Sequence, residues 1–234
     1  MYQQMAKAMG ERKRLLRLPY LPVQEKRLRE ISLFVTLDNP DFYWTKGSFL
    51  LRREGNGAVL QFPLLIPEEE IPSANAAVMS AVSELTKNLP TEPAAVAEEV
   101  CRRLTLWAEY DLSADPLEDR RNQSLWSVFV RRKSLCMGFS KALCLILRLL
   151  GMDCIIVLGS VFGDHENGHS WNMVRIRGGW YHLDVTMGFA CFQPLWERYH
   201  PGMEPPAAPV PFTVLHGSHE MNGRFLYERM MPGS

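Results

Sequence analysis

The stretch CMGFSKALCLILRLLG, residues 136–151, decides the fold of this chain. Its apolar side chains fall on nearly every face of a helix, and this pattern predicts a deeply buried helix over residues 136–150. Gly151 follows at the position where helices commonly end in a left-handed residue. Cys136 stands in the first turn, where the partial positive charge of a helix N-terminus favours a thiolate. The stretch therefore predicts a central helix that begins with a usable thiol.

Three runs of strand-like composition follow this helix. The second and third runs are separated by Gly178-Gly179, a pair that favours a tight hairpin turn. The runs cover residues 154–160, 170–176 and 180–185.

An imidazole and a carboxylate belong to the last two runs. His169, at the start of one run, can reach Cys136 as a base and later as an acid. Asp184, on the neighbouring strand, can accept a hydrogen bond from the other imidazole nitrogen and fix its tautomer. We interpret Gly138 as leaving space for a substrate backbone. The order of these parts predicts a Cys-His-Asp nucleophile site. The remaining cysteines are expected to be structural: Cys101, Cys144, Cys154 and Cys191.

The first 88 residues predict a smaller α/β extension. Asp38-Asn39-Pro40-Asp41 ends a helix, because Pro restricts the residue before it and Asn and Asp favour turns. Gly55-Asn56-Gly57 separates two β-rich runs and predicts a hairpin. The expected elements are a helix over residues 24–37, strands over 42–51 and 58–65, and a helix that starts at Pro67 or after Pro72 and runs to about Asn88.

The region before the central helix predicts one more helix and an irregular segment. Thr91-Glu92-Pro93 is typical of a helix start, and this helix extends to about Tyr110. Residues 111–122 are polar and predict a loop, whereas residues 124–130 fit a short helix or a strand. Residues 201–211 hold five prolines and predict a surface loop.

Composition and charge limit the partners of the chain. Its 26 Lys and Arg residues balance 26 Asp and Glu residues, so it has no basic field for nucleic acid or an anionic membrane. No apolar run reaches the roughly 18 residues of a membrane-spanning helix, and residues 1–10 lack the apolar core of a signal peptide. Five scattered cysteines without a CxxC pair favour reduced thiols and a cytoplasmic location. A domain excised from a larger or exported protein fits the same sequence.

Several motifs, taken together, resemble one family. They are CMGFSKA (136–142), LLGM (149–152), VLG (157–159), HSWNMV (169–174) and WYHLDVT (180–186). In this order they resemble the transglutaminase-like superfamily, and its bacterial branch in particular, over roughly residues 90–190. DNPDFYW (38–44) is similar to a segment that often precedes such domains in bacteria.

The resemblance implies a papain-like α+β fold in which the nucleophile helix packs on an antiparallel sheet. It implies Cys136 as nucleophile, His169 as base and Asp184 as orienting residue, with no metal and no organic cofactor. We expect an N-terminal helix and β-hairpin extension over residues 1–88 and a catalytic domain over residues 89–234.

The activity that this implies is cleavage of an amide or peptide bond through a thioester acyl-enzyme, as in a cysteine protease or amidase. Two alternatives stay open: a true transglutaminase that passes the acyl group to an amine, and a non-catalytic member that binds peptide or glycan. The expected substrate is a protein, a peptide or a small amide.

An oxyanion site is also needed for acyl transfer. The backbone N–H of Cys136 is the first expected donor. Relatives use an upstream polar side chain as the second donor, and the Gln123 amide and the Tyr110 hydroxyl are the two candidates.

One motif suggests different chemistry. His165-Glu166-Asn167-Gly168-His169 matches the H-E-x-x-H pattern of zinc metalloproteases. That chemistry requires a helix, so that both histidines share one face. Asn and Gly disfavour a helix by roughly 0.5–1 kcal/mol each relative to Ala, and β-type runs flank the motif, so we do not expect zinc.

Overall fold

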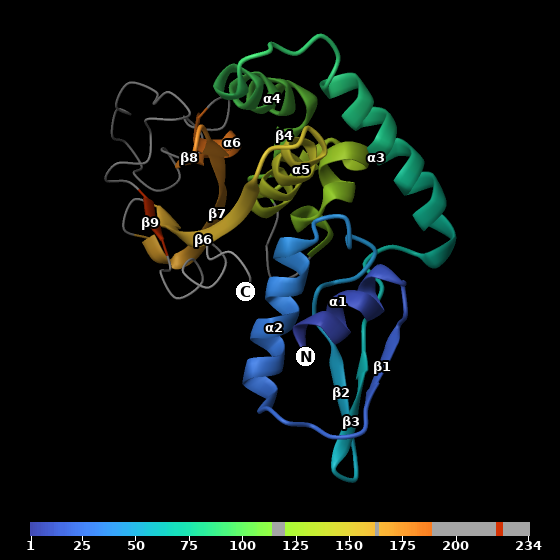
Figure 1. Ribbon diagram of the computed structural model, residues 1–234. Coiled ribbons are helices and arrows are strands. Elements are labelled where there is room, and N and C mark those ends of the chain that lie inside the picture. The colour runs from blue at the N-terminus through green and yellow to red at the C-terminus, as the bar shows by residue number, and fades with distance from the viewer. Residues whose placement is uncertain (114–119, 162–163, 189–218, 222–234) are drawn as a thin grey trace. The chain divides into compact units, whose positions relative to one another are not determined.

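The computed structural model describes residues 1–113, 120–161, 164–188 and 219–221. The chain divides into two compact units, Met1–Ala76 and Ala77–Ser234. The helices and strands of both are drawn in Figure 1. The predicted boundary between residues 88 and 89 lies inside the second unit and stays a prediction.

The first unit is built on a three-stranded antiparallel sheet. Its strands are β1 (Leu15–Leu18), β2 (Leu50–Glu54) and β3 (Gly57–Gln61), in the order β1-β3-β2. Helix α1 (Tyr2–Gly10) packs against β1 and against helix α2 (Glu25–Asp38). Apolar side chains from these elements are fully buried, and this burial is the main source of the unit's stability. They include Met5, Met9, Leu28, Val35 and Leu60.

Two predictions for this unit are confirmed, and two of its elements were not predicted. The helix over residues 24–37 is α2, and the hairpin turn at residues 55–56 joins β2 to β3. Helix α1 and strand β1 were not predicted, so residues 1–65 form two helices and three strands rather than one helix and two strands. Helix α1 has its buried residues Met5, Ala8 and Met9 at helical spacing, so a local signal for it was present. Strand β1 has only four residues, of which one is buried, and this is too short for a clear pattern.

The expected strand over residues 42–51 is also mostly wrong. Only its last two residues belong to β2, and the rest is irregular apart from an isolated bridge between Thr45 and Leu64. Its aromatic side chains are buried, with Tyr43 and Trp44 at most 5% exposed. Trp44 Nε1 donates a hydrogen bond to the carbonyl oxygen of Met9 at 3.2 Å. The run is aromatic because it fills the core, which composition alone does not distinguish from strand pairing.

Helices α3 and α4 precede the central helix. A short 3₁₀ turn, η1 (Glu68–Glu70), leads into α3 (Ile71–Leu85), so the expected helix after Pro67 is confirmed with an end earlier than Asn88. Helix α4 (Pro93–Trp107) begins as predicted, with Pro93 in its first turn. Glu92 caps it, because its carboxylate accepts a hydrogen bond from Ala95 N–H at 2.9 Å.

Short elements connect α4 to the central helix. Strand β4 (Glu109–Tyr110) pairs in parallel with β5 (Lys133–Ser134). Between them lie a 3₁₀ turn, η2 (Arg120–Gln123), and a π-helical turn, η3 (Ser127–Arg131). The ambiguous run over residues 124–130 is therefore largely helical. The expected loop over residues 111–122 falls partly, and the proline-rich loop over 201–211 wholly, outside the described residues.

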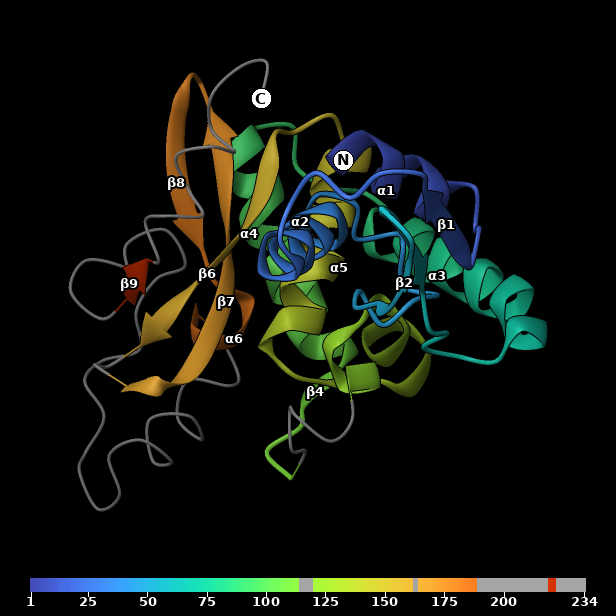
Figure 2. The ribbon, with the colours of Figure 1, turned by 90° about the horizontal axis from the view of Figure 1, so that it is seen from below.

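The second unit is built on an antiparallel sheet and the helix α5 (Cys136–Leu149). The sheet order is β8-β7-β6-β9, and α5 packs against β6 and β7. Figures 1 and 2 show α4 and α5 on the same side of this sheet. The α+β class, with the helix that begins at Cys136 packed on an antiparallel sheet, is confirmed. The remaining elements are β6 (Cys154–Val161), β7 (Asp164–Ile176), β8 (Gly179–Leu183), α6 (Val185–Gly188) and β9 (His219–Met221).

The hairpin between β7 and β8 differs slightly from its prediction. Its turn is Arg177-Gly178, one residue earlier than the expected Gly178-Gly179, and both residues have positive φ angles of 49° and 87°. The turn sets the pairing, so Asn172 stands opposite Leu183. The expected end of α5 is confirmed, because Gly151 has a φ angle of 79°.

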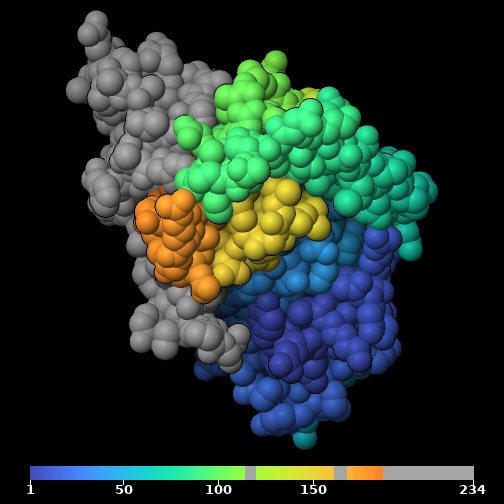
Figure 3. All heavy atoms as spheres, turned by 45° about the horizontal axis from the view of Figure 1, so that its top comes forward, coloured from blue at the N-terminus to red at the C-terminus, as the bar shows by residue number. Residues whose placement is uncertain are grey.

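Helix α5 is less completely buried than its composition predicts. Eight of its residues are buried, but Leu149 in its last turn is 55% exposed. In the space-filling view, yellow atoms of this part of the chain reach the surface beside the green atoms of α4 (Figure 3). None of the helices in the described ranges combines the length and the apolar character needed to cross a membrane.

Candidate active site

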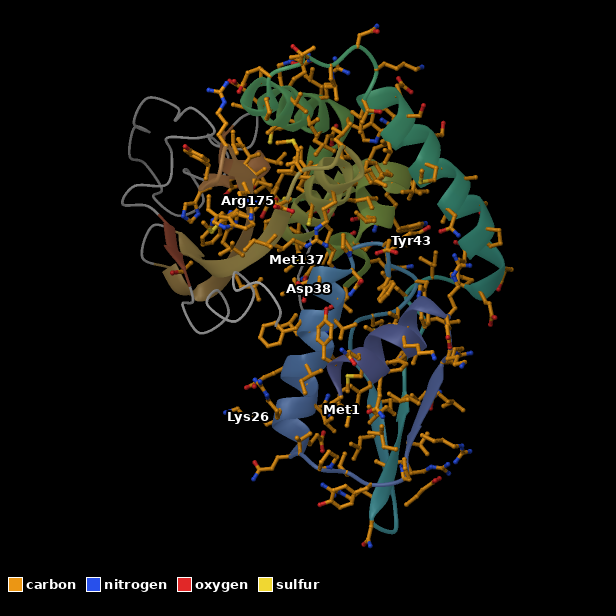
Figure 4. The ribbon with its side chains drawn as sticks, in the orientation of Figure 1. Met1, Lys26, Asp38, Tyr43, Met137 and Arg175 are labelled. Carbon is orange, nitrogen blue, oxygen red and sulfur yellow. The ribbon has the colours of Figure 1, made fainter. Side chains whose placement is uncertain are left out.

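Cys136 is the first residue of α5, and its side chain is half-buried. The segment before it is held by two hydrogen bonds to the carbonyl oxygen of Asn122, from Leu135 N–H and from Ser134 Oγ, each at 2.8 Å. Figure 4 labels Met137, the next residue along α5. The thiol therefore stands at a fixed helix N-terminus, as the sequence predicts.

Gly138 serves packing rather than a substrate. A Cβ at this position would lie 2.0 Å from Ser134 Oγ, 3.0 Å from the carbonyl oxygen of Ser124 and 3.1 Å from Ser127 Oγ. Gly138 itself is buried. The space that the sequence reading assigned to a substrate backbone is filled by the protein, and that interpretation is wrong. The missing side chain lets the first turn of α5 approach the segment that precedes it.

Gly138→Ala should therefore destabilise the protein by about 1–3 kcal/mol, the usual cost of overpacking a core. Urea unfolding monitored by circular dichroism would measure the loss. Gly168→Ala is the matched control, because its Cβ would meet nothing closer than the carbonyl oxygen of Gly159 at 3.9 Å. Equal stability of the two variants would contradict this account of α5 packing.

His169 and Asp184 are in direct contact. His169 Nε2 lies 2.6 Å from Asp184 Oδ2, and both side chains are at most 4% exposed. His169 stands on β7 opposite Gly159, and Asp184 follows the end of β8. Because Nε2 is engaged by the carboxylate, Nδ1 is the ring nitrogen left for Cys136. The pairing expected from the hairpin is thus present, although the roles of the residues stay predictions.

Thr186 holds the other carboxylate oxygen of Asp184 in place, a contact that was not predicted from the sequence. Its backbone N–H and its hydroxyl donate hydrogen bonds to Asp184 Oδ1 at 2.9 and 2.8 Å. The carboxylate is therefore held on one side by Thr186 and on the other by His169. The D-x-T spacing at the start of a short helix was the available signal, because an Asp before a helix commonly accepts such bonds.

The environment of Cys136 favours its thiolate. Burial raises the pKa of the thiol, but the charge of His169 and hydrogen bonds from His169 and Ser170 outweigh it and lower the pKa to about 7. Ser170 contributes both its hydroxyl and its backbone N–H. The sequence reading did not single out this residue, because it follows His169 and would be expected on the opposite face of the strand.

The environment of His169 favours its imidazolium. Burial lowers its pKa, but the negative charges of Asp184 and Cys136, and the hydrogen bonds to both, raise it to about 10. The pKa of His169 thus lies above that of Cys136. Between about pH 7 and pH 10 the two groups form a thiolate–imidazolium pair.

Both oxyanion candidates belong to the segments around the start of α5. Gln123 directly follows Asn122, whose carbonyl oxygen binds Leu135 N–H. Tyr110 pairs with Ser134 in the β4–β5 ladder, and its ring stacks on Phe139 with 6.4 Å between centroids. The assignment of the second donor to Gln123 or Tyr110 stays a prediction.

Core contacts join α5 to the strand that carries His169. Asn172 Nδ2 donates a hydrogen bond to the carbonyl oxygen of Ser140 at 3.0 Å. Trp171 is fully buried against the same sheet, stacks on His169 and donates from Nε1 to His182 Nδ1 at 2.9 Å. Trp171 is therefore a core residue, and His182 has a structural contact.

The other described cysteines are buried away from solvent: Cys101, Cys144 and Cys154. Burial raises the pKa of both Cys101 and Cys154 well above the usual value for a thiol. Cys191 lies outside the described residues.

The H-E-x-x-H motif does not form a helix. Residues 165–169 belong to β7, so the two histidines do not share a helix face as the zinc pattern requires. Within residues 1–113, 120–161, 164–188 and 219–221, no group of three His, Cys, Asp or Glu side chains is placed to hold a metal ion.

Comparisons with known proteins agree with the family resemblance. Residues 81–185 match the family model of the transglutaminase-like superfamily. Kyphoscoliosis peptidase of Mus musculus is 27% identical over 129 residues, which are 50% of this chain and 19% of that protein. The Homo sapiens protein of the same name is 27% identical over 143 residues, 56% of this chain and 22% of that protein. The chain thus spans about a fifth of the length of these relatives.

The superposition on a solved structure described as a TGase covers 83% of this chain and 60% of the TGase chain. The sequence identity is 12% and the TM-score is 0.45. That superposition is too loose to carry an argument about activity.

Proposed function

Residues 81–185 belong to the transglutaminase-like superfamily, and from this premise we propose that the chain is a cysteine-dependent acyl-transfer enzyme. The proposed reaction is hydrolysis of an amide or peptide bond through a thioester on Cys136. The observation that carries the proposal is the short contact of 2.6 Å between His169 Nε2 and Asp184 Oδ2, on an imidazole whose positive charge lowers the pKa of the Cys136 thiol.

In the acylation step, the Cys136 thiolate attacks the carbonyl carbon of the substrate and forms a C–S bond. The carbonyl oxygen becomes an oxyanion, for which the Cys136 N–H and Gln123 or Tyr110 are the proposed donors. The C–N bond then breaks, and the His169 imidazolium donates its proton to the departing nitrogen. Because the ion pair exists before attack, His169 acts first as an acid in this step.

In the deacylation step, neutral His169 removes a proton from water as the oxygen adds to the thioester carbon. The C–S bond breaks, its electron pair returns to sulfur, and the thiolate–imidazolium pair is restored. Asp184 orients the imidazole and stabilises its positive charge throughout. An amine in place of water would complete a transglutaminase reaction through the same thioester.

The substrate class is proposed on chemical grounds: a protein, a peptide or a small molecule with an amide bond. Nucleic acid and membrane partners are not proposed. The chemistry needs a reduced Cys136, which fits the predicted cytoplasmic location, and that location stays a prediction.

The test is incubation of the protein with mixed glutamine-containing peptides in H₂¹⁸O, with and without a biotinylated alkylamine. Hydrolysis is expected, and mass spectrometry should find one ¹⁸O atom in the new carboxylate. Incorporation of the amine instead would favour a transglutaminase. Peptide binding with neither product nor acylated Cys136 would overturn the enzymatic proposal in favour of a binding protein.

A further inference from the structure

Asn122 is a buried residue in the segment that precedes the nucleophile helix. It is 4% exposed and belongs to η2, the turn that also contains Gln123. Its backbone carbonyl oxygen accepts two hydrogen bonds at 2.8 Å, from the N–H of Leu135 and from the hydroxyl of Ser134. Because Leu135 directly precedes Cys136, the backbone of Asn122 is attached to the residue before the nucleophile.

The side-chain amide of Asn122 has a partner at each of its two polar atoms. Its Nδ2 donates a hydrogen bond to Asp111 Oδ2 at 3.3 Å, and its Oδ1 accepts one from Arg131 Nη1. These neighbours fix the orientation of the amide, because a carboxylate only accepts and a guanidinium only donates. Asp111 directly follows β4, and Arg131 ends the turn η3. The amide of Asn122 therefore ties η2 to both of these elements.

Asp111 is an ionised anchor for this amide. It is 4% exposed, and its Oδ1 accepts hydrogen bonds from the N–H and the hydroxyl of Ser113 and pairs with Lys133 Nζ at 3.2 Å. Burial raises the pKa of the Asp111 carboxyl group, but the bonds from Ser113 and Lys133 outweigh burial and lower that pKa. The bond from Asn122 to Oδ2 is therefore charge-assisted, and such bonds are roughly twice as strong as neutral ones.

The hydrogen bond between Asn122 and Asp111 joins the segments that contain the proposed oxyanion donors. Gln123 directly follows Asn122, and Tyr110 directly precedes Asp111. The backbones of Asn122 and Asp111 are also both hydrogen-bonded to the two residues before Cys136. An oxyanion is stabilised only where its donors converge on one point, and a shift of about 1 Å can lower a rate about 10²-fold.

We propose that Asn122, through its hydrogen bond to Asp111, is a positioning residue that fixes the separation between the Cys136 N–H and the second oxyanion donor. This inference rests on the proposed function, and it holds whether Gln123 or Tyr110 is that donor. Asn122 acts on the oxyanion and not on the sulfur. Its loss should therefore slow acylation of Cys136 and leave the reactivity of the thiolate unchanged.

The test compares two reactions of Cys136 in the same protein. In acylation by p-nitrophenyl acetate, the C–S bond forms, the carbonyl oxygen becomes an oxyanion, and the C–O bond breaks to release p-nitrophenolate. In alkylation by iodoacetamide, the thiolate displaces iodide and no oxyanion forms. Asn122→Ala should lower the burst rate of p-nitrophenolate about 10²-fold, after subtraction of the rate in Cys136→Ala. The rate and the pH midpoint of alkylation should keep their wild-type values.

An exchange of the two side chains tests the hydrogen bond itself. Asn122→Asp alone sets two carboxylates against each other and should also slow acylation. The double variant Asn122→Asp/Asp111→Asn restores a bond between an amide and a carboxylate, with donor and acceptor exchanged. It should be acylated at least about tenfold faster than Asn122→Asp, because a hydrogen bond to a charged group is regained. The double variant keeps the buried bond, so it tests the proposal independently of the stability of Asn122→Ala.

Asn39→Ala is the matched control. Asn39 Nδ2 donates a hydrogen bond to the carbonyl oxygen of Val35 at 2.8 Å in the first unit. The same substitution there should leave both the acylation rate and the alkylation rate of Cys136 unchanged.

The outcomes separate the inference from the proposed function. Acylation of Asn122→Ala at the wild-type rate overturns the inference alone. Equal losses of acylation and alkylation also overturn it, because damage to the fold lowers both, and so does a double variant that is no faster than Asn122→Asp. A wild-type Cys136 that is not acylated overturns the proposed function and, with it, this inference.

Discussion

Replacement of Cys136 by alanine should lower kcat/KM by at least about 10⁴-fold. The proposed thioester cannot form without the sulfur, and burial raises the pKa of the Cys101 and Cys154 thiols well above the usual value. The fold should survive, because a half-buried thiol is exchanged for a slightly smaller methyl group in the first turn of α5. Peptide turnover and thermal unfolding of the same preparation would measure both results.

Cys144→Ala is the control for this variant. Cys144 lies in the same helix, is fully buried, and its Sγ lies 3.4 Å from the carbonyl oxygen of Cys154. Its replacement should retain turnover and cost some stability. Full activity in Cys136→Ala, or loss of activity in Cys144→Ala at unchanged stability, would contradict the assignment of the nucleophile.

His169→Ala should both stop turnover and raise the pKa of Cys136. The His169 charge is the largest influence that lowers the pKa of Cys136 to about 7, and burial alone would raise it. In the variant the thiol should therefore stay protonated at pH 7. Loss of the acid–base group contributes a further factor of about 10²–10⁴ in rate. A pH titration of the thiol and a turnover assay would measure the two effects.

His182→Ala is the matched imidazole control. His182 lies on the adjacent strand and accepts a hydrogen bond from Trp171 Nε1. Its loss leaves a buried donor without its partner, which costs about 1–3 kcal/mol of stability. The pKa of Cys136 should not change. A pKa shift of the same size in both variants would remove His169 as the specific partner of Cys136.

The central helix and the sheet could be predicted because their signals are local. The apolar period of residues 136–150 and the stop at Gly151 define α5 without tertiary information. The His169–Asp184 contact followed from a two-residue hairpin turn, which limits the residues that can meet across the strands. The predicted turn lay one residue too late in the sequence, but it still placed His169 and Asp184 near each other on neighbouring strands.

The remaining features depend on tertiary contacts that no local pattern encodes. Gly138 is needed because Ser124 and Ser134 lie against the first turn of α5. Residues 42–49 have strand-like composition but fill a core instead. These features depend on contacts between segments or on irregular backbone, and the hydrophobic periodicity of a sequence predicts neither of them.

The most direct test of the account is alkylation of the native wild-type protein by iodoacetamide across pH 4 to 9, with mass spectrometry to identify the modified cysteines. The thiolate fraction of Cys136 should rise through a midpoint near pH 7, and Cys136 should react long before Cys101 and Cys154, whose pKa values burial raises. Reaction of Cys136 no faster than these buried thiols, or a midpoint at the ordinary thiol pKa of about 8.5, would contradict an activated nucleophile at the start of α5.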